Sequence, residues 1–178
     1  MLRLHKCVFI YVNSVVSRHR IHYLNLFLRE HRPDVMMLAE YRLNPRHNLY
    51  LSDYEIYRQD RWSRYGGGIA VIVRDALSCN RVNLDLGNVE YTAVSIYRAD
   101  GSSLHIIDMY RRPQVTLGLN NLDSLLDLTF REPEHIGADL NAKHPDWGGN
   151  INNRIGVRLR EFLFGYLNLG IRRSDGPT

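Results

Sequence analysis

The sequence predicts an α/β fold, and the order of its first three elements is the main reason. Residues 6–13 are mostly β-branched or aromatic, and residues 34–40 form a second apolar run that ends in a carboxylate. Both runs are typical of buried strands, and the stretch between them has helical periodicity. A strand–helix–strand order places its two strands side by side in parallel, which is the arrangement of the α/β class.

The first helix is predicted between these two strands. Its apolar residues recur at helical spacing while charged residues lie between them, so one face is suited to cover a sheet. Ser17 offers a side-chain oxygen to the N–H groups of the first turn, and Pro33 ends the segment. The apolar positions are Ile21, Leu24, Phe27 and Leu28.

The middle of the chain predicts strands in succession, with little helix between them. Four short β-like runs are joined by turns rich in Gly, Asn, Asp and Ser. The runs cover residues 54–58, 69–74, 91–97 and 103–110. The last two are joined through Ala99-Asp100-Gly101 and predict the clearest hairpin.

Two further helices and one strand are expected in the last third of the chain. Residues 121–130 and 154–164 each carry apolar side chains on one helical face, and residues 135–139 form a short strand between them. No linker or shift in composition divides the 178 residues, so we expect a single domain over residues 1–178.

The composition narrows the class of protein. It is 44% hydrophobic and 24% charged, which excludes disordered and fibrous proteins. The two cysteines form no disulfide framework and no apolar run is long enough for a membrane span, so we expect an intracellular protein. A formal net charge of +4 and a pI near 9.2 favour a polyanionic partner. Arginines cluster within residues 58–64, 111–112 and 154–160.

The most informative segment is 136–149, where a short apolar run ends in acid, amide, histidine and tryptophan residues. Asp139 and Asn141 are two residues apart at the end of a predicted strand, so their side chains point to the same face. Both can therefore address one phosphate group, with Asp139 taking a proton and Asn141 donating a hydrogen bond. Such a pair is typical of an active site at a strand end.

Three more candidates end other predicted strands. Glu40 offers the hard oxygen ligands that Mg²⁺ prefers, Asn13 ends the first strand, and Tyr110 ends the second strand of the hairpin. Arg111 and Arg112 follow Tyr110, and a guanidinium fork matches phosphate oxygens. Each residue also has a plainer interpretation, as an exposed strand end, a turn residue, a packing tyrosine or a solvated arginine.

The segments that contain these residues resemble one family, in the family's order along the chain. The last segment reads Gly-Ala-Asp-Leu-Asn-Ala-Lys-His-Pro-Asp-Trp-Gly from residue 137. It is similar to the endonuclease domain of non-LTR, LINE-like retrotransposons, above all Jockey-type insect elements. These belong to the endonuclease/exonuclease/phosphatase superfamily, with the AP endonucleases and DNase I. The resemblance implies a DNase I-like four-layer sandwich, in which two packed mixed β-sheets are flanked by helices and the site lies at one edge.

The resemblance also implies a function and a set of site residues. It implies a Mg²⁺-dependent DNA endonuclease, with Mn²⁺ as a substitute, that nicks target DNA in the nucleus. The nick leaves a 3′-hydroxyl primer for a reverse transcriptase domain of the same polyprotein, with no membrane and no small-molecule cofactor involved. The residues implied to be catalytic are Asp139, Asn141, Tyr110 and Asn13, with Glu40 as the metal ligand; those implied to contact nucleic acid are Arg111, Arg112 and His144.

The sequence departs from the family pattern at its end. The family's last motifs, a Ser-x-x-Asp strand and a terminal Ser-Asp-His, do not occur before Thr178. We therefore expect a C-terminally truncated domain that is weak or inactive by itself, because the catalytic histidine is missing. Two alternatives stay open: a remnant without catalysis that at most binds nucleic acid through its arginines, and a phosphodiesterase of the same fold that acts on phosphoinositides or sphingomyelin.

Overall fold

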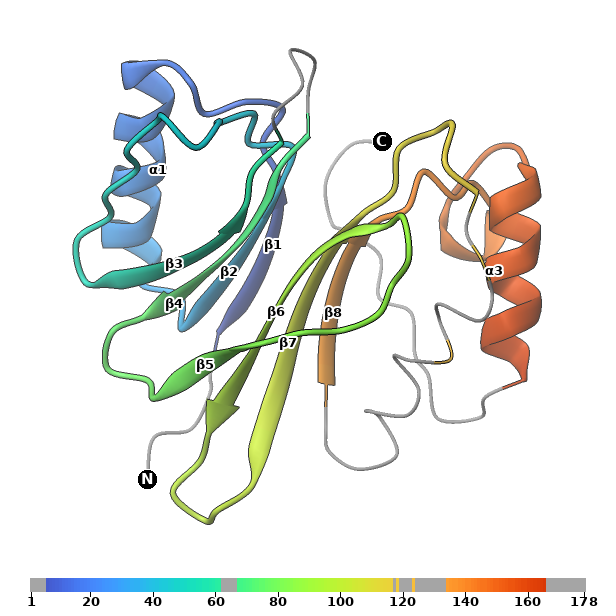
Figure 1. Cartoon of the computed structure of the whole chain (residues 1–178). Helices are drawn as coiled ribbons and strands as arrows, with labels where there is room; N and C mark the ends of the chain where they lie inside the picture. The colour runs from blue at the N-terminus through green and yellow to red at the C-terminus, as the bar shows by residue number, and fades with distance from the viewer. Residues whose placement is uncertain (1–5, 62–66, 117, 119–122, 124–133, 166–178) are drawn as a thin grey trace.

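Two four-stranded mixed sheets pack face to face, and one helix covers the outer face of each (Figure 1). The computed structural model describes residues 6–61, 67–116, 118, 123 and 134–165. Across these residues the layers run α1, first sheet, second sheet, α3. The predicted arrangement of two packed mixed sheets flanked by helices is therefore confirmed.

The first sheet, sheet A, has the strand order β1-β2-β4-β3. Its strands are β1 (Cys7–Tyr11), β2 (Val35–Ala39), β3 (Tyr54–Gln59) and β4 (Ile69–Arg74). β1 pairs with β2 in parallel, as the strand–helix–strand order predicts, and the other pairs are antiparallel. Helix α1 (Arg18–His31) connects β1 to β2 and buries Leu24 and Leu28 on the outer face of the sheet. Ser17 caps the helix as predicted, accepting from the N–H of Arg20.

The second sheet, sheet B, has the strand order β5-β6-β7-β8. Its strands are β5 (Cys79–Val82), β6 (Glu90–Tyr97), β7 (Ser103–Tyr110) and β8 (Glu134–Asp139). β6 and β7 form the predicted antiparallel hairpin, and β8 joins β7 in parallel. The sequence did not predict β5, because this four-residue edge strand has the polar sequence CNRV and lacks an alternating pattern.

Helix α3 (Arg154–Phe164) lies on the outer face of sheet B, at the predicted position. Asn153 caps its first turn, where its side chain accepts a hydrogen bond from the N–H of Gly156 at 2.7 Å. Ile155, Leu159 and Phe162 pack against the sheet. The helix predicted over residues 121–130 lies, apart from residue 123, outside the described residues. Among the described helices, none is long and apolar enough to cross a membrane.

The core between the sheets is built from alternate residues of facing strands. Val35 and Met37 of β2 and Val71 and Val73 of β4 meet four residues of sheet B; these are Val94, Ile96, Leu104 and Ile106. Gly137 of β8 permits a close approach here, because a Cβ at this position would lie 2.5 Å from a ring carbon of Phe9 and 2.8 Å from the sulfur of Met37. The sheets are therefore held in a fixed register, and so are the residues at their ends.

Candidate active site

The predicted catalytic residues come together at one edge of the sandwich. Glu40 directly follows β2, and Asn13 lies two residues beyond β1. Tyr110 and Asp139 are the last residues of β7 and β8 and are partners in that parallel pair. Parallel pairing brings the carboxyl ends of β1 and β2, and those of β7 and β8, to the same edges of their sheets. A hydrogen bond from the Tyr110 hydroxyl to Glu40 then joins the two sheets at this edge.

The backbone at this edge turns sharply at three of the predicted residues. Asn13, Glu40 and Asn141 have φ angles of 42°, 56° and 50°. This left-handed region is uncommon for residues other than glycine and costs of order 1–3 kcal/mol for each residue. Main-chain hydrogen bonds hold the turn at Glu40, whose carbonyl accepts from the N–H of Ser14 at 2.7 Å. Backbone strain of this kind is often found at functional sites, so it supports a role for this edge.

Glu40 is buried and has several hydrogen-bond donors. Its Oε1 accepts from the hydroxyl of Tyr110 at 2.6 Å. Its Oε2 accepts from the hydroxyl of Tyr11 at 3.1 Å and from Arg42 at 3.2 Å. Burial acts to raise the pKa of Glu40, but these three hydrogen bonds and the charge of Arg42 outweigh it and lower the pKa. The carboxylate is therefore ionised at neutral pH, as a metal ligand must be.

Asp139 shows the opposite shift. Burial raises its pKa, and the charge of Glu40 adds to this, while the N–H of Asn141 and the charge of Arg111 oppose it. The N–H of Asn141 donates to Oδ1 of Asp139 at 3.2 Å and orients the carboxyl group. A carboxylate whose pKa lies above its ordinary value is a better proton acceptor at neutral pH. The environment of Asp139 therefore suits a general base.

Arg111 is buried, with 2% of its surface exposed, and its guanidinium holds the loops that follow β7 and β8. Its nitrogen atoms donate to the main-chain carbonyls of Leu140, Asn141, Arg112, Pro113 and Val115. The carbonyl of Arg111 in turn accepts from the side-chain amide of Asn141 at 2.9 Å. The donors of Arg111 are thus engaged inside the protein, where they fix the position of Asn141, and its predicted contact with a phosphate stays a prediction.

Arg112 and His144 are the other two residues predicted to contact nucleic acid. The side chain of Arg112 is 50% exposed, and its Nε lies 3.4 Å from a carboxylate oxygen of Glu90. His144 is only 8% exposed; its Nδ1 accepts from the N–H of Asp146 at 3.1 Å and caps the short 3-10 helix η1 (Pro145–Trp147). His144 thus shapes the loop after β8, and its predicted contact with nucleic acid stays a prediction. Arg112 stays available to a ligand.

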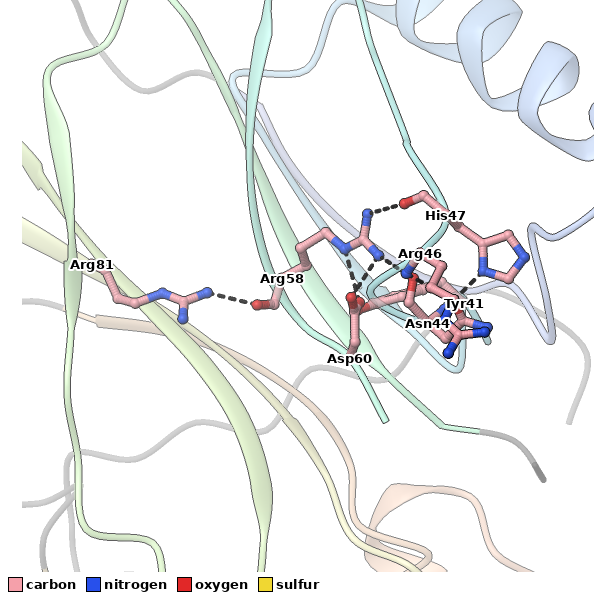
Figure 2. A network of polar contacts seen from close by, with 7 residues as sticks. All are labelled: Tyr41, Asn44, Arg46, His47, Arg58, Asp60 and Arg81. Atoms are coloured by element: carbon pink, nitrogen blue, oxygen red, sulfur yellow. Dashed lines mark hydrogen bonds and ion pairs between the residues drawn. The ribbon is translucent and has the colours of Figure 1, made fainter. Parts of the chain in front are cut away.

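A network of polar contacts fixes the segment that follows Glu40 (Figure 2). Tyr41 is buried and donates through its hydroxyl to Asp60. Arg58 forms a bidentate pair with the same carboxylate at 2.8 and 2.6 Å and donates to the carbonyls of Asn44 and His47. One carboxylate and one guanidinium neutralise each other here. Arg58, a member of an arginine cluster in the sequence, therefore supports the site from inside.

Several side chains that surround the site carry no clear signal in the sequence. Tyr11 and Arg42 lie within two residues of the predicted Asn13 and Glu40, yet neither residue type signals a role at such a position. Glu90 is the register partner of Tyr110 across the β6–β7 hairpin, and Arg61 pairs with Glu90. The predicted hairpin carried a signal for Glu90, since counting back from its turn pairs residue 90 with residue 110.

The donor set at this edge fits a hydrated magnesium ion. Mg²⁺ keeps most of its waters and is bound through one or two carboxylates, and Glu40 offers an ionised one beside the exposed Asn13. Within the described part of the chain, no group of three His, Cys, Asp or Glu residues could enclose a metal ion. The described residues thus suit an ion that retains water, and they do not form a closed metal cage.

Part of the sequence matches a known family, and the fold matches several solved structures. Residues 104–170 match the model of a family described as Endonuclease-reverse transcriptase, whereas no curated protein sequence matches the chain. Among solved structures, the chain is similar to the endonuclease domain of TRAS1, a telomere-specific non-LTR retrotransposon, with a TM-score of 0.67 and 14% identity. The alignment covers 89% of this chain and 69% of that endonuclease domain chain.

Two other solved structures share the fold. AP endonuclease LMAP from Leishmania major has a TM-score of 0.61 at 15% identity, over 90% of this chain and 66% of that one. TDP2 of D. rerio, complexed with a single strand DNA product, has a TM-score of 0.55 at 16% identity, over 80% of this chain and 63% of that one. The chain therefore has a DNase I-like fold, as predicted, and residues 104–170 resemble the Endonuclease-reverse transcriptase family.

Proposed function

We propose that this chain is the phosphodiester-cleaving part of a metal-dependent DNA endonuclease. The observation that carries the proposal is the pair of carboxylates with opposite pKa shifts at one sheet edge, Glu40 lowered and Asp139 raised. Two such groups are suited to two different tasks in one reaction. The family model matched by residues 104–170 and the endonuclease fold support the reaction class.

In the proposed reaction, Asp139 removes a proton from water as the water oxygen attacks phosphorus. The bond between phosphorus and the 3′ oxygen breaks, and this oxygen takes a proton from solvent, which leaves a 3′-hydroxyl and a 5′-phosphate. Asn141 and Asn13 orient the phosphate. Burial and the hydrogen bond to Glu40 raise the pKa of Tyr110, so its hydroxyl keeps its proton, which it donates to Glu40. To stabilise the transition state, the hydroxyl would turn from Glu40 and donate that proton to the phosphate instead.

Glu40 would hold the metal ion, Mg²⁺ or Mn²⁺, with Asn13 beside it. When bound, the ion neutralises negative charge on the phosphate oxygens. Tyr110, Tyr11 and Arg42 keep Glu40 ionised and fix its two oxygens. These contacts prepare the carboxylate before any ligand arrives, so little reorganisation is needed on binding.

We further propose the context that the family suggests. The nick leaves a primer for a reverse transcriptase domain of a larger polyprotein acting on nuclear DNA, which the name of the matched family supports. The 178 residues contain no Ser-Asp-His motif. A histidine that acts in proton transfer commonly contributes about 10²-fold to 10⁴-fold. We therefore expect the isolated chain to cleave slowly.

The test is the nicking of supercoiled plasmid by the purified chain, with Mg²⁺ and with EDTA. We expect open-circular DNA that requires Mg²⁺ and is lost in Asp139→Ala. The matched control is Asp100→Ala, which removes an exposed aspartate from the turn between β6 and β7, at the opposite end of the hairpin from Tyr110. Circular dichroism checks that each variant folds.

Two outcomes would overturn the nuclease proposal. One is equal nicking by wild type and Asp139→Ala, which would indicate a contaminating nuclease. The other is a folded wild-type chain that cuts nothing over a long incubation with either metal. Salt-sensitive DNA binding unchanged by Asp139→Ala would then favour the alternative, a remnant that binds nucleic acid through its arginines.

A further inference from the structure

Three side chains form a row across sheet B at the candidate active site. Asp139 lies opposite Tyr110 in the β7–β8 register, and Glu90 lies opposite Tyr110 in the β6–β7 register. Residues directly opposite in a sheet point to the same face, so the row continues from the general base, through Tyr110, to Glu90. Glu90 is outside the reaction described above, and its carboxylate is mostly buried, with 13% of the side chain exposed.

Glu90 holds the first of two arginines, Arg61. The Nε of Arg61 donates to Oε1 of Glu90 at 2.9 Å, and a terminal nitrogen pairs with the same oxygen. The guanidinium carbon lies 5.4 Å from the centre of the Tyr110 ring, within the range of a cation–π contact. Gly67 makes room for it, because a Cβ there would overlap the guanidinium. Arg61 is thereby fixed against the residue that bridges the two sheets.

The second arginine on Glu90 is Arg112. Its Nε lies 3.4 Å from the same oxygen that Arg61 contacts, and half of its side chain is exposed. Among these three groups alone, two guanidinium groups contact one carboxylate, which is an excess of one positive charge. The Arg58–Asp60 pair in Figure 2 has no such excess, because one guanidinium there uses both carboxylate oxygens.

An excess positive charge is needed at this place if the substrate is DNA. Glu40 and Asp139 are both negative when ionised, and they repel the phosphates of an approaching strand. An arginine already held in one orientation loses less conformational entropy when it binds a phosphate. Arg112 is suited to this place, since its Nε lies 3.4 Å from the carboxylate of Glu90 and half of its side chain is exposed.

We propose that Glu90 is a positioning residue that holds Arg112 and Arg61 as a second phosphate subsite, for a backbone phosphate of DNA next to the scissile one. In this subsite Arg112 contacts the phosphate, and Arg61 fills the space between Glu90 and Tyr110. The inference rests on the proposed function, because it assumes that DNA lies across this edge. The plainer role for Glu90 is to tie the segment after β3 to sheet B, with no effect on DNA binding beyond its charge.

The two roles predict opposite effects of Glu90→Gln. This change removes a negative charge from a surface that meets a polyanion, so charge alone predicts tighter DNA binding. If Glu90 positions Arg112, binding instead weakens several-fold, because the arginine is released from its orientation. Glu30→Gln, on the exposed face of α1, makes the same change of charge away from the site and should leave binding within twofold of wild type.

The experiment measures binding of a short fluorescein-labelled DNA duplex to the full chain by anisotropy, without metal and over a series of KCl concentrations. Arg112→Ala should weaken binding about tenfold. It should also make the negative slope of log K against log salt less steep, by about 1. Arg112→Lys keeps the charge but loses the fork, so it should restore the slope and only part of the affinity. Thermal melts check that each variant is folded.

Each result decides the proposal. The subsite is supported if Glu90→Gln binds DNA more weakly and Arg112→Ala has a less steep salt slope. Tighter binding in Glu90→Gln, or an unchanged slope in Arg112→Ala, overturns it. Binding without metal needs no cleavage, so the subsite can stand if plasmid nicking fails. It can equally fall while nicking succeeds, and the two proposals are therefore judged separately.

Discussion

The two sheets bring one carboxylate each to the same edge and place them in opposite environments. Sheet A presents Glu40 to three side-chain donors, which lower its pKa in spite of burial. Sheet B presents Asp139 to burial and to the charge of Glu40, which outweigh one main-chain N–H and the charge of Arg111, and its pKa is raised. The difference arises from the neighbours and not from the residue type, because both groups are carboxylic acids near the same solvent boundary.

The contrast between the two pKa shifts supports the two proposed roles without reference to relatives. An acid that stays ionised suits the binding of a cation, while an acid whose pKa is raised suits the exchange of protons. The structure also shows how the pair is linked, since the negative charge of Glu40 is itself one cause of the raised pKa of Asp139. A substitution that removes the charge of Glu40 should therefore lower the pKa of Asp139.

The largest expected effect is that of Asp139→Asn on the rate of cleavage. The amide keeps the size of the carboxyl group but cannot take a proton, so the rate should fall by about 10²-fold to 10⁴-fold. In the wild type, the rate should fall as the pH drops through the raised pKa of Asp139, because the protonated acid is inactive. Cleavage rates of a labelled duplex across pH measure both effects. A residual Asp139→Asn rate with an unchanged acid limb would contradict the role of base.

A smaller effect is expected for Tyr110→Phe, and Tyr11→Phe is its matched control. Both variants remove one hydroxyl from Glu40, but Tyr110 is buried and bonds at 2.6 Å, whereas Tyr11 is exposed and bonds at 3.1 Å. A hydrogen bond to a charged group contributes about 1.5–3 kcal/mol when buried. Tyr110→Phe should therefore slow cleavage by about 10-fold to 100-fold, and Tyr11→Phe by much less. Equal losses in single-turnover rates would show that burial does not distinguish the two donors.

The sequence could predict the parts of this site that lie at strand ends. Asn13, Glu40, Tyr110 and Asp139 each follow or end an apolar run, and such runs show where a strand stops. Parallel pairing then brings those ends to common edges. The sequence could not show which of two neighbouring arginines is buried, because Arg111 and Arg112 have the same side chain. Only the positions of the loops after β7 and β8 decide which guanidinium faces the carbonyls.

The contacts between the two sheets could not be predicted from the sequence either. Tyr110 is 70 positions from Glu40, and Arg61 is 29 positions from Glu90. No periodicity links residues so far apart. The sequence also did not show that β7 is buried along almost its whole length, because polar residues lie among its apolar ones. Asp108 is the clearest example, because it is a charged residue type with no exposed surface.

Asp108 extends the comparison of the two sheets into the core. It lies two residues before Tyr110, with no exposed surface, and neither carboxyl oxygen has a hydrogen-bond partner among the described residues. The hydroxyl of Thr92, opposite it in β6, is unpartnered in the same sense. Burial, with the charge of Asp139, raises the pKa of Asp108 well above its ordinary value. Main-chain N–H groups nearby act to lower this pKa, but they form no hydrogen bond of normal geometry with the carboxyl group. Burial therefore favours the neutral form of Asp108 in the folded protein, whereas Asp60, the residue after β3, has Arg58 as an ion-pair partner.

The smallest expected effect is the loss of a pH dependence of stability in Asp108→Asn. Below the unfolded pKa of about 3.9, both states hold the proton and this group adds no pH dependence. Between that pH and the raised folded pKa, only the unfolded state releases it, so stability falls by up to about 1.4 kcal/mol per pH unit as the pH rises. Asp108→Asn cannot ionise and should remove this fall. Urea midpoints across pH measure the difference from wild type. Parallel curves for the two proteins would mean that Asp108 is ionised in the fold, which requires a buried partner for its charge.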